Sequence, residues 1–334
     1  MIEVTQKFLR MFPSSHLGLV NQKSFKLDPQ IRLFLAFSNF MKDPHLQSVE
    51  DARKTFTFAS RQAFTFRRED VLVQNLSITG SKRTIPARLY TPAEFGEGSG
   101  LILFMHGGGW VLGNLESHDR FCRALAKGTS HAVMAVDYAL SPEYPFPVAL
   151  HEGLESYIWL QEHIDSLLNY PRSILVCGDS AGGNLVTSLC FLCKQKGIEQ
   201  PSGQILFYPV TNLASQSASR REFANGFLLS LDTMKWFERH YAHGQDASNP
   251  LISPLHALDC KGIAPAMIFL AGFDILYDEG LAYARLLKKQ GVQVDLHIVE
   301  RQIHGFANLA GLVPSASKDL NDCVRKIARW EAWT

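Results

Sequence analysis

Short apolar runs alternate with helical stretches over the last two thirds of the chain. The apolar runs, which predict strands, are Leu101–Met105, Ala132–Val136, Ile174–Cys177, Gln204–Tyr208, Met267–Ala271 and Val292–Val299. The helical stretches between them include His118–Lys127, Ala149–His163, Gly182–Lys196 and Glu279–Gln290. Strands that alternate with helices in this way predict an α/β fold, a parallel sheet with helices on both of its faces.

The first fifty or so residues predict helices, and two extended segments follow them. Asp28 precedes a proline and is a helix-start signal, and the stretch from there to Met41 has apolar residues at intervals of three and four. A second short helix is predicted to begin at Asp51. The extended segments are Val71–Ile78 and Ile85–Tyr90. Together with the runs above they predict a mostly parallel sheet of about eight strands.

The interval between Tyr208 and Ala266 is too long for a simple crossover between neighbouring strands. It contains an amphipathic stretch, Leu231–His243. An insertion of this size at the carboxyl end of a strand usually lies over the site that α/β sheets build there. We therefore expect residues 1–55 to form a helical cap segment, and residues 56–334 to form the main α/β domain with a cap insertion around 210–250. The alternative is that both segments are peripheral packing.

The composition excludes several classes of protein. The 334 residues are 46% hydrophobic and 19% charged, which is not the composition of a disordered or collagen-like chain. The 33 basic and 32 acidic residues give a net charge of +1, so there is no electrostatic reason to expect nucleic acid as a partner. No stretch approaches the roughly 20 apolar residues of a membrane span, and residues 1–20 lack a secretory pattern. The expected location is the cytoplasm.

The six cysteines do not form a disulfide framework in a chain of this length. Cys190 and Cys193 form a CxxC, but this pair lies in a helical pattern and has no second pair of ligands. We interpret the cysteines as structural thiols and predict no metal site.

The strongest chemical signal is the motif Gly178-Asp-Ser180-Ala-Gly182, which stands between an apolar strand and a helical pattern. This is the context of a nucleophile elbow, a sharp strand-to-helix turn that exposes the serine hydroxyl. Side chains at the two glycine positions would collide with the strand and the helix. The free N–H groups at the helix N-terminus favour a developing negative charge. The alternative is a glycine-rich turn with an incidental serine.

A second motif, His106-Gly107-Gly108-Gly109, ends the first parallel strand. Acyl transfer places negative charge on a carbonyl oxygen, and fixed backbone N–H groups stabilise that charge. We predict an oxyanion hole formed by the amides of Gly107, Gly108 and Ala181, with Gly109 as a further candidate. We interpret His106 as a residue that fixes the loop. A phosphate-binding loop is the alternative, but the glycine spacing and the lysine of such loops are missing.

With both motifs in place, the sequence resembles the hormone-sensitive-lipase-like (family IV) esterases of the α/β-hydrolase superfamily. The resemblance covers nearly the whole chain and rests on His106–Trp110, Gly178–Gly183, Val136–Glu143, Tyr208-Pro-Val and Ser253–Leu255. It implies an α/β-hydrolase fold with a cap over the site, no cofactor, and hydrolysis of carboxylic esters with small or medium acyl groups. A homodimer is an expectation of the resemblance alone.

The order serine, acid, histidine of this fold indicates where the base lies. His304 follows the last strand-like run, in a loop from which its imidazole can reach Ser180. The family has a histidine followed by glycine and phenylalanine at this place, as here. His297 lies inside the strand pattern and is interpreted as a packed residue. We therefore predict that His304 is the general base.

Asp274 directly follows the penultimate strand and is the predicted acid. The family pattern here is aspartate, proline, leucine, any residue, aspartate, and this chain has Ile275 in place of the proline. Asp278 is the reserve candidate, although a carboxylate at the start of a helix also has a purely structural explanation.

These residues predict a carboxylesterase, a serine hydrolase that cleaves short- to medium-chain acyl esters through a Ser180-His304-Asp274 acyl-enzyme mechanism. The expected partner is a small-molecule ester. The same site would also serve an amidase, an aryl formamidase or a lipase. A non-catalytic small-molecule receptor is a further alternative, which some relatives become by losing the catalytic histidine; the presence of His304 argues against it.

Overall fold

A computed structural model describes residues 26–38, 42–62, 70–168 and 173–333. Eight strands form one sheet in the order β1-β2-β4-β3-β5-β6-β7-β8. The strands are β1 (Val71–Thr79), β2 (Thr84–Pro92), β3 (Leu101–Met105), β4 (Ala132–Val136), β5 (Ile174–Asp179), β6 (Gly203–Phe207), β7 (Ala266–Phe273) and β8 (Val294–Ile303). Only the β1–β2 and β2–β4 pairs are antiparallel. The mostly parallel sheet of about eight strands is confirmed.

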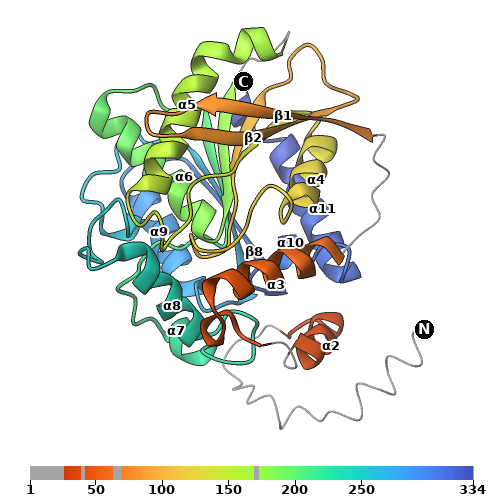
Figure 1. Ribbon diagram of the computed structural model, residues 1–334, viewed down its shortest axis with the longest axis vertical. Helices are drawn as coiled ribbons and strands as arrows, with labels where there is room; N and C mark the ends of the chain where they lie inside the picture. Colours follow the sequence, from red (N-terminus) through yellow and green to blue (C-terminus); the bar gives the residue numbers. More distant parts are fainter. Residues whose placement is uncertain (1–25, 39–41, 63–69, 169–172, 334) are drawn as a thin grey trace.

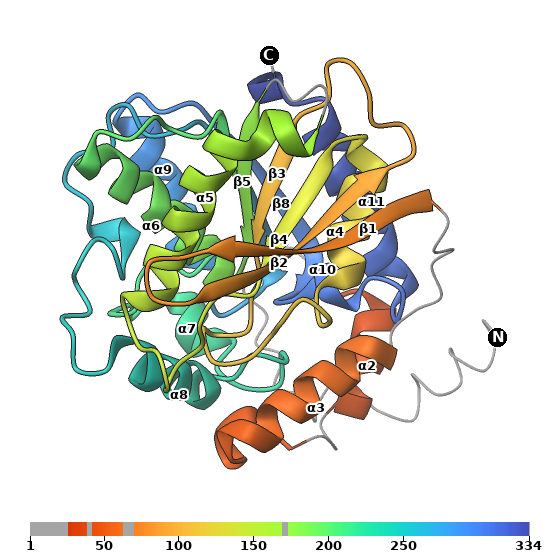
Figure 2. The ribbon, with the colours of Figure 1, turned by 45° about the horizontal axis from the view of Figure 1, so that its top comes forward.

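Helices cover both faces of the sheet, as Figures 1 and 2 show. One face carries α5 (Val148–Leu167), α6 (Ala181–Lys196) and α9 (Tyr277–Lys289). The other face carries α4 (Asp119–Thr129) and α11 (Pro314–Ala328). This arrangement of layers confirms the predicted α/β fold. Among the described residues, no helix has the length and apolar character needed to cross a membrane.

The central strands are apolar throughout because both of their sides are buried. Every residue of β3, β4 and β6 is buried. Leu101, Leu103 and Met105 of β3 belong to the core cluster on the α5 and α6 side. Ile102 and Phe104 belong to the cluster on the α4 and α11 side. The side chains thus alternate between two cores, which explains the continuous apolar runs in the sequence.

Two predicted boundaries were wrong for identifiable reasons. The helix expected to begin at Asp51 is α3 (Val49–Gln62), because Ser48 caps it. The Ser48 hydroxyl accepts a hydrogen bond from Asp51 N at 3.1 Å and donates one to the Asp51 carboxylate at 2.7 Å. The last strand was predicted to end at Val299 but continues to Ile303. It lies at the edge of the sheet, and the apolar run is interrupted after Val299 by the exposed Glu300 and Arg301 before the strand ends in the buried Gln302 and Ile303.

Four further helices and a short turn lie at the carboxyl end of the parallel strands (Figures 1 and 2). They are α2 (Pro29–Ser38), α3, α7 (Ala218–Glu222), α8 (Leu231–Ala242) and the turn η2 (Pro44–Leu46). The N-terminal segment contacts the insertion directly, since His45 Nδ1 lies 2.9 Å from Thr233 Oγ1 on α8. The helical reading of residues 1–25 and the predicted helix end at 39–41 lie outside the described residues. The predicted boundary after residue 55 falls inside α3, so we propose that the cap segment extends to the end of this helix.

Arg53 attaches α3 to the body of the protein. Its guanidinium donates to the carbonyl oxygens of Val111 and Ser141, at 2.8 and 2.9 Å, and to both carboxylate oxygens of Glu143. Val111 follows the glycine loop after β3, so this one side chain connects a cap helix to a loop of the predicted site.

Replacing Arg53 with Met keeps the apolar stem but removes these hydrogen bonds. We expect a loss of about 1–2 kcal/mol in the free energy of unfolding and a fall in Tm of about 2–5 °C, measured by calorimetry. Lys54→Met is the matched control on the same helix, because Lys54 is exposed and forms a surface ion pair with Glu50. An equal Tm for Arg53→Met and Lys54→Met would contradict the anchoring role.

Candidate active site

Ser180 occupies a strained turn between β5 and α6. Its φ of 54° and ψ of −117° are unusual for a residue with a side chain. Glycines make the turn possible, because a Cβ at Gly178 would lie 2.4 Å from the backbone of Gly182. A Cβ at Gly182 would lie 2.0 Å from the carbonyl oxygen of Met105 on the neighbouring strand. A side chain at either glycine position would therefore collide with the backbone, as expected from the sequence. The turn has the geometry of a nucleophile elbow.

The predicted nucleophile, base and acid lie in one hydrogen-bonded row. Ser180 Oγ is 2.9 Å from His304 Nε2, and His304 Nδ1 is 2.9 Å from Asp274 Oδ2. Asp274 follows β7 and His304 follows β8, so both come from the carboxyl end of the sheet. All three side chains are buried, and the Asp274 carboxylate also accepts a hydrogen bond from Leu276 N. With Nδ1–H donating to the carboxylate, Nε2 is free to accept the hydroxyl proton of the serine.

Asp278, the reserve candidate for the acid, has a different set of contacts. Its carboxylate accepts a hydrogen bond from Ser219 N at 2.7 Å, and its own N–H donates to Ser219 Oγ. Ser219 lies at the start of α7 in the insertion. The residue after Asp278, Glu279, is buried and accepts a hydrogen bond from Thr211 N, and burial raises the pKa of Glu279 to about 7. The carboxylates at 278 and 279 thus attach the insertion to α9, while Asp274 faces the histidine.

The structure corrects one of the predicted oxyanion donors. The Gly107 N–H donates to Asp179 Oδ1 at 2.8 Å, so it is not available to a substrate. The predicted role of Gly107 as a donor was therefore wrong. Among the hydrogen bonds of the described residues, none has the amide of Gly108, Gly109 or Ala181 as its donor. These three amides remain as candidates for the oxyanion hole.

The insertion packs directly on the glycine loop. A Cβ at Gly109, which has a φ of 62°, would lie 2.1 Å from the ring of Phe237 on α8. The ring of Trp110 stacks on Tyr241 of the same helix, with centroids 4.2 Å apart and an interplanar angle of 3°. Helix α8 therefore packs with two aromatic side chains against the loop that contains the candidate oxyanion donors Gly108 and Gly109.

His106 has the surroundings of a structural residue. Its Nδ1 hydrogen-bonds the carbonyl oxygen of Gly107 at 2.8 Å, and its ring stacks on Tyr138 with centroids 4.3 Å apart. Burial, and next the proximity of His118, lower the pKa of His106 to about 3. The ring is therefore neutral near pH 7, and it braces the loop as the sequence suggests.

Sequence reasoning did not predict three residues of the site, Asp179, His118 and Asn308, although Asp179 lies within the serine motif. Asp179 is 2% exposed, and its carboxylate lies 3.4 Å from His118 Nε2 and 3.0 Å from Asn308 Nδ2. The hint for Asp179 is a carboxylate at the end of an apolar strand, where a buried charge needs partners. The identity of those partners depends on the tertiary structure.

The six cysteines are free and buried. Across residues 26–38, 42–62, 70–168 and 173–333, no three His, Cys, Asp or Glu side chains are grouped so that they could hold a metal ion.

Comparisons with known proteins agree with this architecture. A family model described as the alpha/beta hydrolase fold matches residues 102–308. Carboxylic ester hydrolase LipN of Mycobacterium tuberculosis is 38% identical over 307 residues, which cover 89% of this chain and 81% of the relative. Ethyl acetate hydrolase of Pseudomonas putida is 34% identical over 281 residues, which cover 83% of this chain and 88% of the relative.

A solved structure extends the likeness to three dimensions. LAE6, an α/β-hydrolase enzyme from the metagenome of Lake Arreo in Spain, superposes with a TM-score of 0.85 and 31% identity, covering 90% of this chain and 98% of that one. The chain therefore belongs to the α/β-hydrolase family, in its hormone-sensitive-lipase-like branch, as the two glycine motifs indicated. The relatives named above are ester hydrolases, and this chain is likewise a hydrolase.

The close packing at Gly182 predicts that even one methyl group abolishes the site. In Gly182→Ala the new Cβ would overlap a backbone oxygen, which cannot move away as a flexible side chain can. We expect less than about 1% of wild-type ester turnover, with aggregation or a Tm lowered by several degrees. Gly96→Ala is the matched control, because its Cβ meets nothing within 4 Å. Wild-type turnover in Gly182→Ala would contradict the geometry of the elbow.

Proposed function

We propose that the protein is a carboxylic ester hydrolase that acts on short- to medium-chain acyl esters through a Ser180-His304-Asp274 triad. The observation that supports this most directly is the continuous row of two 2.9 Å hydrogen bonds from the Asp274 carboxylate through His304 to the Ser180 hydroxyl. The names of two relatives, a carboxylic ester hydrolase and an ethyl acetate hydrolase, favour the same substrate class.

The proposed reaction is a two-step acyl transfer. Ser180 Oγ attacks the ester carbonyl carbon while His304 Nε2 takes its proton. The carbonyl oxygen becomes negative and accepts hydrogen bonds from the amides of Gly108, Gly109 and Ala181. His304 then gives its proton to the departing alcohol, and an acyl-enzyme remains on Ser180. Water repeats the sequence, losing a proton to His304, and the acid is released as Ser180 regains its hydrogen.

Asp274 has two tasks in this scheme. It fixes the tautomer of His304 by accepting the Nδ1–H, and it stabilises the imidazolium that forms at each transition state. The amide of Ala181 is well placed for charge stabilisation because it begins the 16-residue helix α6, whose N-terminus carries a partial positive charge.

The preference for small acyl groups is supported by the bulk of the insertion. Phe237 stands against Gly109, one of the proposed oxyanion donors, so the space beside the reacting carbonyl is bounded by an aromatic ring. A homodimer remains an expectation of the family resemblance alone, and a cytoplasmic location and the division into a cap and a catalytic domain remain predictions of the sequence.

The first test of the proposed function is a series of p-nitrophenyl esters from acetate to palmitate, with p-nitroacetanilide as the amide. We expect the highest kcat/KM on the shorter esters, little turnover of the amide, and a loss of at least about 10⁴-fold in kcat for Ser180→Ala. Ser188→Ala, on the helix that follows Ser180, is the control, because the buried Ser188 hydroxyl has no hydrogen-bond partner within the described residues. Wild-type turnover by Ser180→Ala, or a preference for the amide, would overturn the proposal.

The second test separates the two candidates for the acid. Asp274→Asn retains the shape of the side chain but favours the wrong tautomer of His304, so kcat should fall about 10³- to 10⁴-fold. Asp278→Asn should stay within about fivefold of wild type, since Asp278 bonds the start of α7. The opposite result for the two variants would exchange the roles of these residues.

A further inference from the structure

Asp179 is a buried carboxylate beside the nucleophile that takes no part in the proposed triad. It is the last residue of β5, and it is 2% exposed. A charged group is rarely buried to this extent unless it is paired and hydrogen-bonded. The structure supplies three neighbours: Gly107 N at 2.8 Å, Asn308 Nδ2 at 3.0 Å and His118 Nε2 at 3.4 Å.

These contacts connect the three segments that build the active site. Gly107 begins the loop of the oxyanion donors, and Asn308 lies on α10 (Phe306–Leu309), four residues after His304. Asp179 itself immediately precedes Ser180. One carboxylate therefore holds together the oxyanion loop, the nucleophile elbow and the loop of the histidine, which come from distant parts of the chain.

The contact with Gly107 determines which amides of the loop are left for a substrate. With the Gly107 N–H directed at Asp179, the next two N–H groups, at Gly108 and Gly109, have no partner among the described residues. The fit is close, since a Cβ at Gly107 would lie 2.5 Å from Asp179 Oδ2. Any other residue at 107 would push the carboxylate away and turn the loop.

The surroundings of this carboxylate favour its ionised form. Burial alone would raise the pKa of Asp179, but the adjacent His118 ring and the Gly107 amide outweigh burial and hold the pKa below its usual range. An ionised carboxylate only accepts hydrogen bonds, so it suits two N–H donors from different segments.

We propose that Asp179 is a positioning residue for ester hydrolysis: by accepting hydrogen bonds from Gly107 and Asn308 it fixes the oxyanion loop relative to Ser180 and His304. This inference rests on the proposed function and adds a residue that touches none of the reacting atoms. Its loss should reduce the stabilisation of the transition state and leave substrate binding nearly unchanged.

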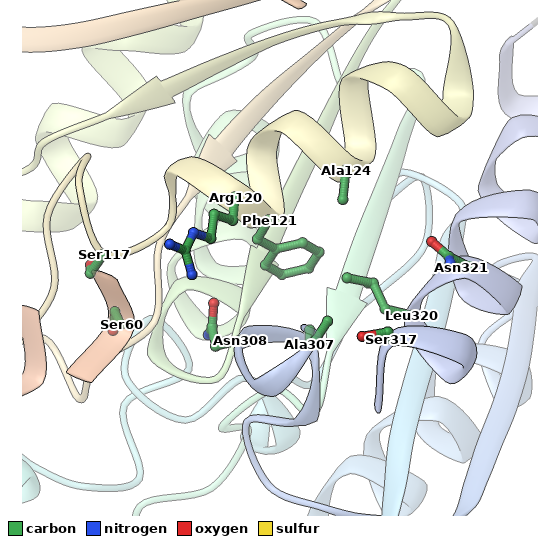
Figure 3. Close-up of a pocket in the computed structure, with 11 residues that line it drawn as sticks. Ser60, Ser117, Arg120, Phe121, Ala124, Ala307, Asn308, Ser317, Leu320 and Asn321 are labelled. Carbon is green, nitrogen blue, oxygen red and sulfur yellow. The ribbon is translucent and has the colours of Figure 1, made fainter. Parts of the chain in front are cut away.

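Asn308 offers a way to test the pairing with little risk to the fold. It lines a cavity of about 160 Å³ between α4, α10 and α11, and Figure 3 shows it on α10 across from Arg120 on α4. A side chain substituted at position 308 has the cavity on one side, whereas the Asp179 side chain is enclosed by protein atoms. In Asn308→Asp the new carboxylate would face that of Asp179, with no donor between them. In the double variant Asp179→Asn/Asn308→Asp an amide would again face a carboxylate, with the donor and the acceptor exchanged.

The experiment compares Asp179→Ala, Asn308→Asp and the double variant Asp179→Asn/Asn308→Asp with wild type on p-nitrophenyl butyrate. We expect kcat to fall about 30- to 300-fold in Asp179→Ala, with KM within about threefold. Asn308→Asp should lose about tenfold or more in kcat, and the double variant should regain most of that loss. Glu152→Gln is the control, since Glu152 is also a buried carboxylate that accepts a backbone N–H, from Ala139 at 2.7 Å, away from the triad.

A second measurement separates positioning from a general loss of stability. Sulfur accepts hydrogen bonds weakly, so an aligned oxyanion hole favours an ester over its thionoester, and the ratio of their kcat/KM values reports the alignment. We expect this ratio to fall about tenfold in Asp179→Ala and in Asn308→Asp, and to stay at the wild-type value in Glu152→Gln even if its Tm falls.

The outcomes that overturn the proposal are distinct from failure of the proposed function. A kcat within twofold of wild type in Asp179→Ala, a loss confined to KM, or an Asn308→Asp loss that the double variant does not repair would each overturn it. If Asp179→Ala does not fold, Asn308→Asp and the double variant decide alone. Activity that survives in Ser180→Ala would instead refute the triad.

Discussion

The close approach of three backbones at the nucleophile is the constraint on which the site depends. Gly178 and Gly182 let β5 and α6 meet at the elbow, and Gly182 lies directly against the carbonyl oxygen of Met105 on β3. This packing holds Ser180 at a φ of 54°, a strained backbone conformation that exists only because the surroundings enforce it. The serine hydroxyl is thereby directed out of the carboxyl end of the sheet, where the other groups of the site are found.

The topology of the sheet brings those other groups to the same edge. In a parallel sheet the loops that follow the strands all emerge on one side. Asp274 directly follows β7 and His304 directly follows β8, although 30 residues separate them and 124 residues separate His304 from Ser180. The row of hydrogen bonds is thus a consequence of strand order combined with short loops. Helices α3 and α8 cover the same carboxyl end of the sheet. Arg53 of α3 bonds the loop after β3, and Phe237 of α8 packs against Gly109 in that loop.

The row of Ser180, His304 and Asp274 could be predicted because Ser180 and Asp274 directly follow apolar strands, and because His304 precedes the glycine and phenylalanine that the family resemblance places there. The fold could be predicted for the same reason: strands buried on both sides give continuous apolar runs, as in Leu101–Met105 and Ala132–Val136. The end of β8 could not be predicted, because the exposed, charged Glu300 and Arg301 interrupt the apolar run before the strand ends at Ile303. The start of α3 is set by the cap at Ser48, which lies three residues before the predicted start at Asp51.

The oxyanion hole shows where pattern alone is insufficient. Gly107, Gly108 and Gly109 are chemically identical, and the sequence gives no reason to exclude the first of them. The hydrogen bond from the Gly107 amide to Asp179 excludes Gly107 as an oxyanion donor, and it joins residues 72 positions apart. Contacts of this kind depend on the three-dimensional arrangement of the chain, so they cannot be predicted from the sequence.

The most direct test of the Ser180-His304-Asp274 triad is covalent labelling with a p-nitrophenyl phosphonate. This reagent reacts with a serine only when a base and an oxyanion hole act together. We expect one phosphonyl group per chain, located on Ser180 by peptide mass spectrometry, with ester turnover lost in proportion to labelling. Turnover that persists in fully labelled protein, or a label found on another residue while Ser180 stays free, would contradict the account.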